Sequence, residues 1–175
     1  MAFTVRPVRT DDGPLLADLH VRSWRNAYRG ILSDAFLENG VVEERRGVWA
    51  ARMAAWDPAR SFAEIAETDG VPCGFVCVMR DIGPEHGVLL DNLHVLPGNR
   101  GGGIGRRLLA DAARWVAEHC PGSPMYLTVY FANENACAFY RRMGGVASEP
   151  YDEREHDGRT HRVLRFVWPK PETVR

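Results

Sequence analysis

The chain of 175 residues has no long hydrophobic run and no excess of positive charge. No apolar stretch approaches the ~20 residues of a membrane-spanning helix, so we expect no membrane segment. A formal net charge of -1 at pH 7 argues against general affinity for nucleic acid. The N-terminus leads into Phe3 to Val8, whose alternating pattern indicates a strand rather than a signal peptide.

Cysteine is scarce, and the chain lacks the cysteine spacings of redox and zinc sites. The four cysteines, Cys73, Cys77, Cys120 and Cys137, form no Cys-x-x-Cys pair and accompany no paired-histidine pattern. We therefore expect no metal site, and we interpret the cysteines as buried, reduced thiols of a cytoplasmic protein.

The most informative stretch runs from residue 93 to residue 109. A short apolar run ends at Val95 and is followed by a Pro-Gly turn, Arg100, a cluster of glycines and a helix-like pattern. Glycines lack a Cβ atom, so a ligand can approach their main chain closely. Free N–H groups at a helix start favour a phosphate or pyrophosphate, and Arg100, Arg106 and Arg107 add positive charge at the same point.

Two common phosphate-binding motifs do not fit this loop. A Walker A loop requires Gly-Lys followed by Ser or Thr, whereas Gly105 is followed by Arg106 and Arg107. The dinucleotide fingerprint requires a third glycine where this chain has Arg106 or Leu108. A nucleotide-phosphate protein and a tight turn without a ligand stay as alternatives.

Three segments carry a family resemblance. The pattern Arg100-x-x-Gly103-x-Gly105, preceded by Leu93-x-Val95-x-Pro97, resembles the acyl-CoA pyrophosphate loop of the GNAT superfamily of N-acetyltransferases. Residues 133–144, with Asn133, Ala136, Phe139-Tyr140 and Gly144, are similar to a later motif of that family, and residues 23–30 are similar to a less specific opening. One departure is Gly145, where an aromatic residue is common.

The pattern of elements predicts an α/β domain with a mixed sheet. We expect one N-acetyltransferase domain over residues 1–175, with its core at about 3–168. Strands are expected at 3–8, 62–67, 71–79, 87–95, 125–130, 146–153 and 160–168, and helices after Asp11, at 41–53, 103–119 and 134–143. The resemblance implies that helices flank a mostly antiparallel sheet, splayed between its fourth and fifth strands.

The resemblance also implies a site for acetyl-CoA as cosubstrate. Its pyrophosphate would be held by the loop formed by Arg100, Gly101, Gly102, Gly103, Ile104, Gly105 and Arg106. The main chain at Leu93, His94 and Val95 would hydrogen-bond the pantetheine arm like another strand. Asn133 would bind near the donor arm.

Acetyl transfer needs an acid for the departing thiolate and a base for the amine. Tyr140 is the candidate acid, because a phenol with a reference pKa of ~10 can donate to a thiolate of ~8.5; core packing is the alternative. Asp91 is the candidate base or amine anchor, since strict alternation places it in step with Leu93 and Val95. Alternation points His94 to the other face, unless a bulge intervenes.

The acceptor site is expected between the N-terminal helices and the last hairpin. Trp24 and Tyr28 are candidates for its wall, with Trp49 and Trp56 as weaker ones, although tryptophans on helices also serve as ordinary core. The sequence names no acceptor.

The leading hypothesis is an acetyl-CoA-dependent N-acetyltransferase that moves an acetyl group directly to a primary amine of a small molecule, peptide or protein. The alternative is a non-catalytic acyl-CoA sensor with the same fold. We expect no nucleic-acid or membrane partner. Dimers are common in such folds, so a homodimer is compatible with the resemblance, although the sequence shows no interface pattern.

Overall fold

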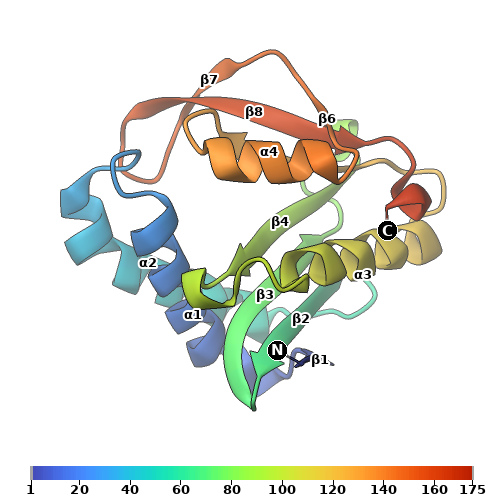
Figure 1. Cartoon of the computed structure of the whole chain (residues 1–175), viewed down its shortest axis with the longest axis horizontal. Coiled ribbons are helices and arrows are strands. Elements are labelled where there is room, and N and C mark those ends of the chain that lie inside the picture. The colour runs from blue at the N-terminus through green and yellow to red at the C-terminus, as the bar shows by residue number, and fades with distance from the viewer. Residues whose placement is uncertain (1, 175) are drawn as a thin grey trace.

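The computed structural model describes residues 2–174, which form a twisted eight-stranded sheet with helices on both faces (Figure 1). The strands are β1 (Phe3–Pro7), β2 (Ser61–Thr68), β3 (Val71–Met79), β4 (Val88–Val95), β5 (Met125–Tyr130), β6 (Val146–Ala147), β7 (Tyr151–Arg154) and β8 (Thr160–Trp168). The α-helices are α1 (Gly13–Ala27), α2 (Val41–Ala54), α3 (Ile104–His119) and α4 (Glu134–Arg142). Short helical turns lie at Thr10–Asp12, Phe36–Gly40, Pro84–His86, Pro97–Asn99 and Pro171–Thr173.

The strand order is β1-β2-β3-β4-β5-β8-β6, and β7 also pairs with β8. Every pairing is antiparallel except β4 with β5, which is parallel. The expected mixed, mostly antiparallel sheet is therefore confirmed.

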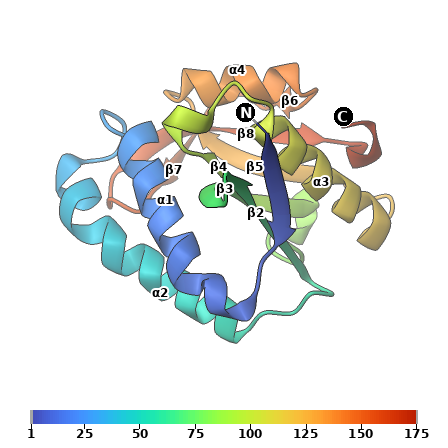
Figure 2. The same ribbon diagram turned by 60° about the horizontal axis from the view of Figure 1, so that its bottom comes forward.

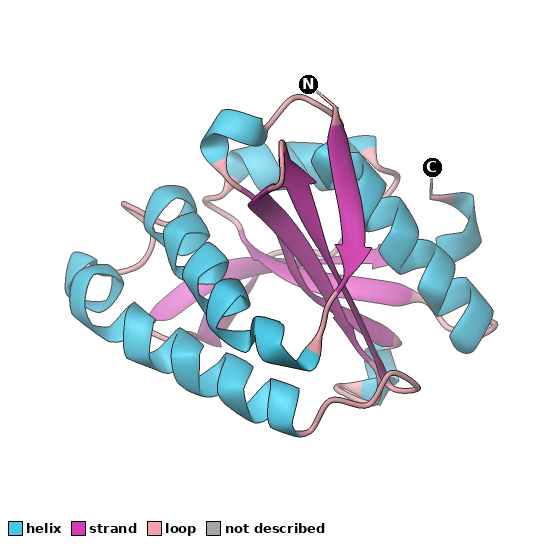
Figure 3. Ribbon diagram, turned by 90° about the horizontal axis from the view of Figure 1, so that it is seen from below, coloured by secondary structure: helices cyan, strands magenta, loops and turns pink. Residues whose placement is uncertain are grey.

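The two faces of the sheet bury separate clusters of side chains. Helix α3 packs on one face, where Leu108 and Val116 contact Val76 and Leu127 in the largest cluster. Helices α1 and α2 cover the other face, as Figures 2 and 3 show. The faces follow from alternation along β3 from Phe75 to Met79, where Val76 and Val78 point to one side and Phe75, Cys77 and Met79 to the other.

Turn chemistry explains the β2–β3 hairpin. Asp69 and Gly70 have φ angles of 53° and 75°, and positive φ at both central residues suits a two-residue hairpin turn, which Asp-Gly favours. The sequence predicted this hairpin correctly.

The expected strand over residues 146–153 is wrong as a single element. The segment is split into β6 and β7, which pair with β8 through Ala147↔Phe166 and Tyr151↔Val163. Pro150 lies in the interruption and has no N–H to donate to the sheet. The hydroxyl of Ser148 instead accepts a hydrogen bond from the Arg165 N–H at 3.0 Å.

The unusual Gly145 is explained by its neighbours. A Cβ atom at this position would lie 2.8 Å from the ring of Trp168 and 3.0 Å from Phe166. The indole N–H of Trp168 donates to the Met143 carbonyl at 2.9 Å, which fixes the ring against the end of α4. Trp168 thus occupies the space that a larger side chain at residue 145 would need.

Candidate active site

A splay between β4 and β5 opens the site. The two strands pair only through Val88↔Met125 and Leu89↔Tyr126 and then diverge. A cavity of about 680 Å³ lies along the splay. It is bounded by parts of α1, β4, the loop before α3, β5 and α4, namely Ser23, Asn26, Ala27, Tyr28, Leu90, Asp91, Leu93, His94, Val95, Asn99, Arg100, Gly101, Gly103, Gly105, Arg106, Leu127, Thr128, Val129, Asn133, Asn135, Ala136, Ala138, Phe139, Tyr140 and Arg142.

The glycine loop exposes main-chain groups to this cavity. Gly101 and Gly103 have φ angles of 85° and 88°, a conformation that other residues adopt only with strain. Nothing lies within 4 Å of a Cβ atom built on either residue, so the space beside them is open. Helix α3 begins directly afterwards at Ile104, and the N–H groups of its first turn have no partner within the helix. The loop can therefore receive an anion.

Arginine side chains surround the same loop. The Nε–H of Arg100 donates to the Val95 carbonyl at 2.9 Å, which leaves the rest of its exposed guanidinium beside the cavity. Arg106 and Arg142 also line the cavity. Gly102 and Ile104, which were also expected in the donor site, do not line it: Gly102 is exposed and Ile104 is buried in the core.

The expected register along β4 is wrong at Asp91. Cys77 pairs with Asn92, but Val78 pairs with Leu90, so Asp91 is the extra residue of a β-bulge. Leu93 and Val95 pack toward α3. The Asp91 carboxylate instead reaches the α2 side of the sheet, and it still lines the cavity.

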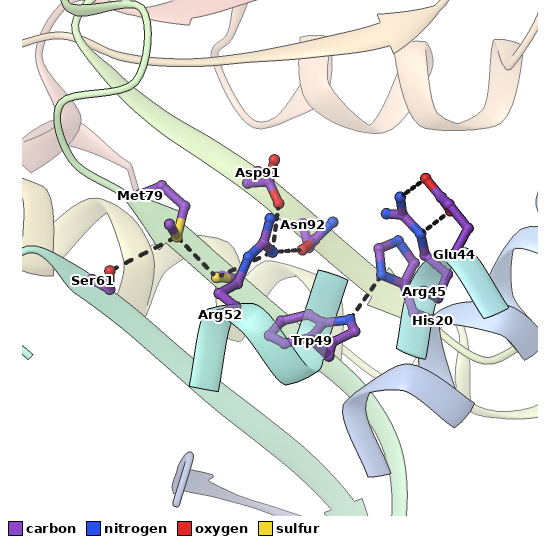
Figure 4. A network of polar contacts seen from close by, with 10 residues as sticks. His20, Glu44, Arg45, Trp49, Arg52, Ser61, Met79, Asp91 and Asn92 are labelled. Carbon is purple, nitrogen blue, oxygen red and sulfur yellow. Dashed lines mark hydrogen bonds and ion pairs between the residues drawn. The ribbon is translucent and has the colours of Figure 1, made fainter. Parts of the chain in front are cut away.

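Arg52 of α2 holds the bulge in place (Figure 4). Its Nη1 contacts the Asp91 Oδ2 at 2.8 Å and the Asn92 Oδ1 at 3.0 Å, and its guanidinium lies 4.9 Å from the ring centre of Trp49. The Arg52 side chain is only 15% exposed. One oxygen of Asp91 is thus fixed by an ion pair, and Oδ1 has no other polar partner among residues 2–174.

His94 also lines the cavity, from the face that packs on α1. Its Nδ1 lies 2.9 Å from the hydroxyl of Ser23, and its ring centre lies 4.8 Å from that of His20. Burial, helped by the positive charges of Arg45 and Arg100, lowers the pKa of His94 to about 3. The imidazole is therefore neutral at physiological pH.

His20 lies deeper behind His94. The indole N–H of Trp49 donates to its Nδ1 at 3.1 Å (Figure 4), so the remaining proton of the neutral ring sits on Nε2. That Nε2 is buried and has no partner among the described residues. Burial lowers the pKa of His20 well below its usual value.

Tyr140 reaches the cavity from α4. It packs against Phe166 and Trp168, with ring centres 5.6 and 6.0 Å away. Its hydroxyl has no hydrogen-bond partner among residues 2–174. Burial raises the pKa of Tyr140, so the phenol is protonated at neutral pH and can donate a hydrogen bond.

Asn133 has a structural contact as well as a place in the cavity. Its side-chain oxygen accepts a hydrogen bond from the Ala136 N–H at 3.3 Å and caps α4. Capping residues of this kind stabilise a helix start by roughly 1 kcal/mol. The side chain thereby fixes the start of the helix that carries Tyr140.

The aromatic candidates for the acceptor side separate into two groups. Tyr28 lines the cavity and packs edge-on against Tyr130 at 4.9 Å. Trp24 lies behind it, 5.3 Å away, under the guanidinium of Arg45, and it does not line the cavity. Trp49 is fully buried, so its weaker assignment to the wall is wrong.

Several cavity residues were not predicted from the sequence. Ser23 and Asn26 of α1, Thr128 of β5 and Arg142 of α4 line the site. Their place depends on how distant elements meet. Ser23 and Asn26 fall within residues 23–30 and Arg142 within residues 133–144, and these resembling segments are the only signal that could have pointed to them.

Among the described residues, no helix is long and apolar enough to cross a membrane. No group of three or more histidine, cysteine, aspartate or glutamate side chains in that part of the chain is arranged to hold a metal ion. All four cysteines are buried and unpaired.

Comparisons with known proteins agree with this geometry. Residues 21–145 match the model of the acetyltransferase (GNAT) family. A probable N-acetyltransferase of Mycobacterium tuberculosis is 30% identical over 150 residues, which cover 79% of this chain and 76% of the relative. The streptothricin acetyltransferase of Streptomyces lavendulae is 35% identical over 104 residues, covering 57% of this chain and 53% of that protein.

Among solved structures, the PaiA N-acetyltransferase of Thermoplasma acidophilum in complex with coenzyme A has a TM-score of 0.73 and 18% identity. The match covers 96% of this chain and all of that one (100%), and it confirms the expected fold. The family model covers most of the chain, and the more extensive curated relative is itself described as an N-acetyltransferase. The chain therefore belongs to the GNAT family of acetyltransferases.

Proposed function

We propose that this enzyme transfers an acetyl group from acetyl-CoA directly to a primary amine of a small molecule, peptide or protein. The observation that carries the proposal is one cavity that joins the glycine loop, the free edge of β4, Tyr140 and Asp91. Donor loop, acid and carboxylate come from separate elements, yet they meet along the splay between β4 and β5.

Donor binding rests mostly on main chain. The pyrophosphate would lie on the amides of residues 101–106 at the start of α3, beside Arg100 and Arg106. The pantetheine amides would pair with β4 between Leu93 and Val95, because the described part of β5 pairs only with the beginning of β4.

The chemistry divides between the two sides of the splay. Asp91 would anchor the acceptor ammonium through Oδ1 and take its proton, directly or through water. The freed amine attacks the thioester carbonyl, the carbon–nitrogen bond forms, and the carbon–sulfur bond breaks. Tyr140 would protonate the departing sulfur; the proton that the nitrogen then loses passes through water and restores the phenol of Tyr140. The phenol is neutral, so it has a proton to give, and the ion pair with Arg52 keeps Asp91 in position.

The proposal also covers the chemical class of the acceptor and the cellular compartment of the enzyme. Streptothricin acetyltransferase is a relative with a small-molecule acceptor, which supports a small amine here. The four unpaired, buried thiols support action in the reducing cytoplasm.

The test is release of free thiol from acetyl-CoA in the presence of a panel of primary amines, with donor affinity measured in parallel. We expect thiol release that depends on both the amine and the enzyme. Tight binding of acetyl-CoA without thiol release from any amine would favour a sensor. A failure to bind acetyl-CoA at millimolar concentration would overturn the whole proposal.

A further inference from the structure

The face of β5 and β8 that adjoins the acceptor side carries a guanidinium. Thr128 of β5 is paired with Arg165 of β8, so their side chains leave the sheet on the same face. Two residues along, Tyr130 and Val163 form the next pair on that face and belong to a cluster with Trp24 of α1. Arg165 therefore points to the α1 and α2 side of the sheet.

The register places Arg165 near the apex of the splay. Leu89 is the last residue of β4 that pairs with β5, opposite Tyr126. Two residues further on each strand are Asp91 and Thr128, which both line the cavity. Thr128 then pairs with Arg165. Asp91, Thr128 and Arg165 thus follow one another across β4, β5 and β8; the first two line the cavity, and Arg165 lies directly beside Thr128, next to the cavity wall.

Arg165 forms no ion pair with a carboxylate among residues 2–174. Its Nε is buried and makes no hydrogen bond within the described chain. Nη2 makes a single long contact of 3.4 Å to the hydroxyl of Tyr151. The guanidinium lies 5.4 Å from the ring centre of Tyr151 and 6.0 Å from that of Tyr126. Among residues 2–174 no carboxylate comes within ion-pair distance of it.

The nearby acidic strand makes no hydrogen bond or ion pair with it among residues 2–174. Glu153 follows Tyr151 on β7 with the same alternation; burial and the charge of Glu155 raise the pKa of its carboxyl, and the more distant charge of Arg165 lowers it. A buried N–H without a partner is costly, and a guanidinium between aromatic rings keeps its fork available for one planar anion.

We propose that Arg165 binds a carboxylate of the acceptor, so that the preferred acceptors are small amines that carry a carboxylate, such as amino acids. The inference rests on the proposed function and names its substrate class. The acceptor amine would lie at Asp91, next to the thioester, and its carboxylate would lie over β5 and β8 against Arg165. Thr128, which is exposed between them, would contact the body of the acceptor.

Matched pairs of acceptors test the proposal. Phenylalanine against phenethylamine, methionine against 3-(methylthio)propylamine and lysine against cadaverine differ only by the carboxylate. We expect kcat/KM to favour the amino acid by at least about tenfold, the effect of one charge-assisted hydrogen-bonded contact. Equal rates within the pairs, or faster acetylation of the plain amines, would overturn the inference and leave the proposed acetyltransferase intact.

Variants test whether the preference for amino acids over plain amines depends on Arg165. Arg165→Gln should abolish the discrimination within each pair by slowing the amino acid alone, with acetyl-CoA affinity unchanged, and Arg165→Lys should restore part of it. Arg162→Gln is the matched control, because Arg162 lies on the same strand, is exposed and contacts the ring of Phe131 instead. A preference that survives in Arg165→Gln would contradict the assignment.

A binding measurement distinguishes failure of the carboxylate site from failure of the proposed acetyltransferase function. Protein saturated with coenzyme A is titrated with phenylalanine or phenethylamine and followed by NMR. Tighter binding of phenylalanine that Arg165→Gln removes would support the carboxylate site, even if neither compound is acetylated. Equal binding of both compounds, or none, together with equal rates would overturn it. Loss of coenzyme A binding itself would instead overturn the proposed function.

Discussion

The two halves of the cavity present different kinds of groups, main chain in one and side chains in the other. The half proposed to bind the donor consists of the loop over residues 99–103, the start of α3 and the edge of β4, and it offers mainly peptide N–H and C=O groups. The acceptor half consists of side chains from α1, β4, β5 and, in our inference, β8. Asp91 and His94 on that half are each held by a residue more than 35 positions away, Arg52 and Ser23.

This difference separates what is general from what is specific in the enzyme. Main-chain groups can bind a constant cosubstrate, because their geometry depends on backbone conformation and little on side-chain identity. Side chains held by distant partners can vary with the acceptor while the sheet stays the same. Damage to the donor half should therefore abolish donor binding, whereas damage to the acceptor half should change acceptor use and pH behaviour.

The largest effect is expected in the donor loop. Gly103→Glu should weaken acetyl-CoA binding by more than about 100-fold, because the left-handed φ of 88° strains a side chain and a carboxylate there repels phosphate. Calorimetry with acetyl-CoA measures the loss. Gly98→Glu adds the same charge just before the loop, at an exposed residue with open space around it, and it should bind almost normally. Equal affinities of both variants would contradict the loop assignment.

The next effect is expected where the two halves meet. Tyr140→Phe removes only a hydroxyl that has no partner within the described chain, so the fold and the donor affinity should be preserved. If the phenol protonates the thiolate, kcat should fall by about 100-fold. Steady-state turnover assays give kcat, and calorimetry on the same variant gives the affinity for acetyl-CoA. A kcat equal to that of the unaltered enzyme would remove the acid role.

A smaller effect is expected at Asp91, the proposed amine anchor. Asp91→Asn should raise the KM for the amine by about tenfold, since a charged hydrogen bond contributes roughly 1.5–3 kcal/mol, and it should flatten the pH–rate profile if the carboxylate also takes the proton. Asp152→Asn on β7 is exposed and serves as the control. An unaltered KM with an unaltered profile would point to another group.

Sequence patterns predicted the backbone of the proposed donor half, namely the glycine turn and the helix that follows it, because its determinants are local. Glycine at residues 101 and 103 is needed for positive φ, and an apolar period of 3.6 residues marks α3. The β2–β3 turn, β5 and α4 follow from equally local rules. Tyr140 was found through its motif, although helical spacing alone favours core packing, and the structure gives it both a core contact and a cavity position.

The acceptor half could not be predicted in the same way, because its geometry depends on contacts between distant segments. Nothing around Asp91 in the sequence indicates a bulge, which requires Arg52 of α2 to meet both Asp91 and Asn92. The place of Trp168 over Gly145 likewise joins the end of β8 to the end of α4. Such pairings decide which face a side chain reaches, and alternation alone gave the wrong face for Asp91.

The smallest effect concerns stability and tests whether the half-buried His94 of the acceptor half behaves differently from the exposed donor loop. The pKa of His94 is lowered from 6.5 to about 3 in the folded protein. Between these values the unfolded chain binds a proton that the folded chain does not, so stability falls as pH falls below 6.5. At pH 5.5 this residue should cost ~1 kcal/mol of unfolding free energy relative to pH 7.5.

His94→Gln keeps a hydrogen-bonding group for Ser23 but cannot titrate, so it should lose less stability on acidification than the unaltered protein. Urea unfolding at pH 7.5 and 5.5 measures the change for each protein. Glu64, whose pKa burial raises to about 7 with opposite sign, acts alike in both proteins and cancels in the difference. The pKa of His20 is lowered by burial and also by the charge of His94, so the difference reports the two neighbouring histidines together. An identical pH dependence in both proteins would mean that water reaches His94 in solution, and the acceptor half would then be as open as the donor loop.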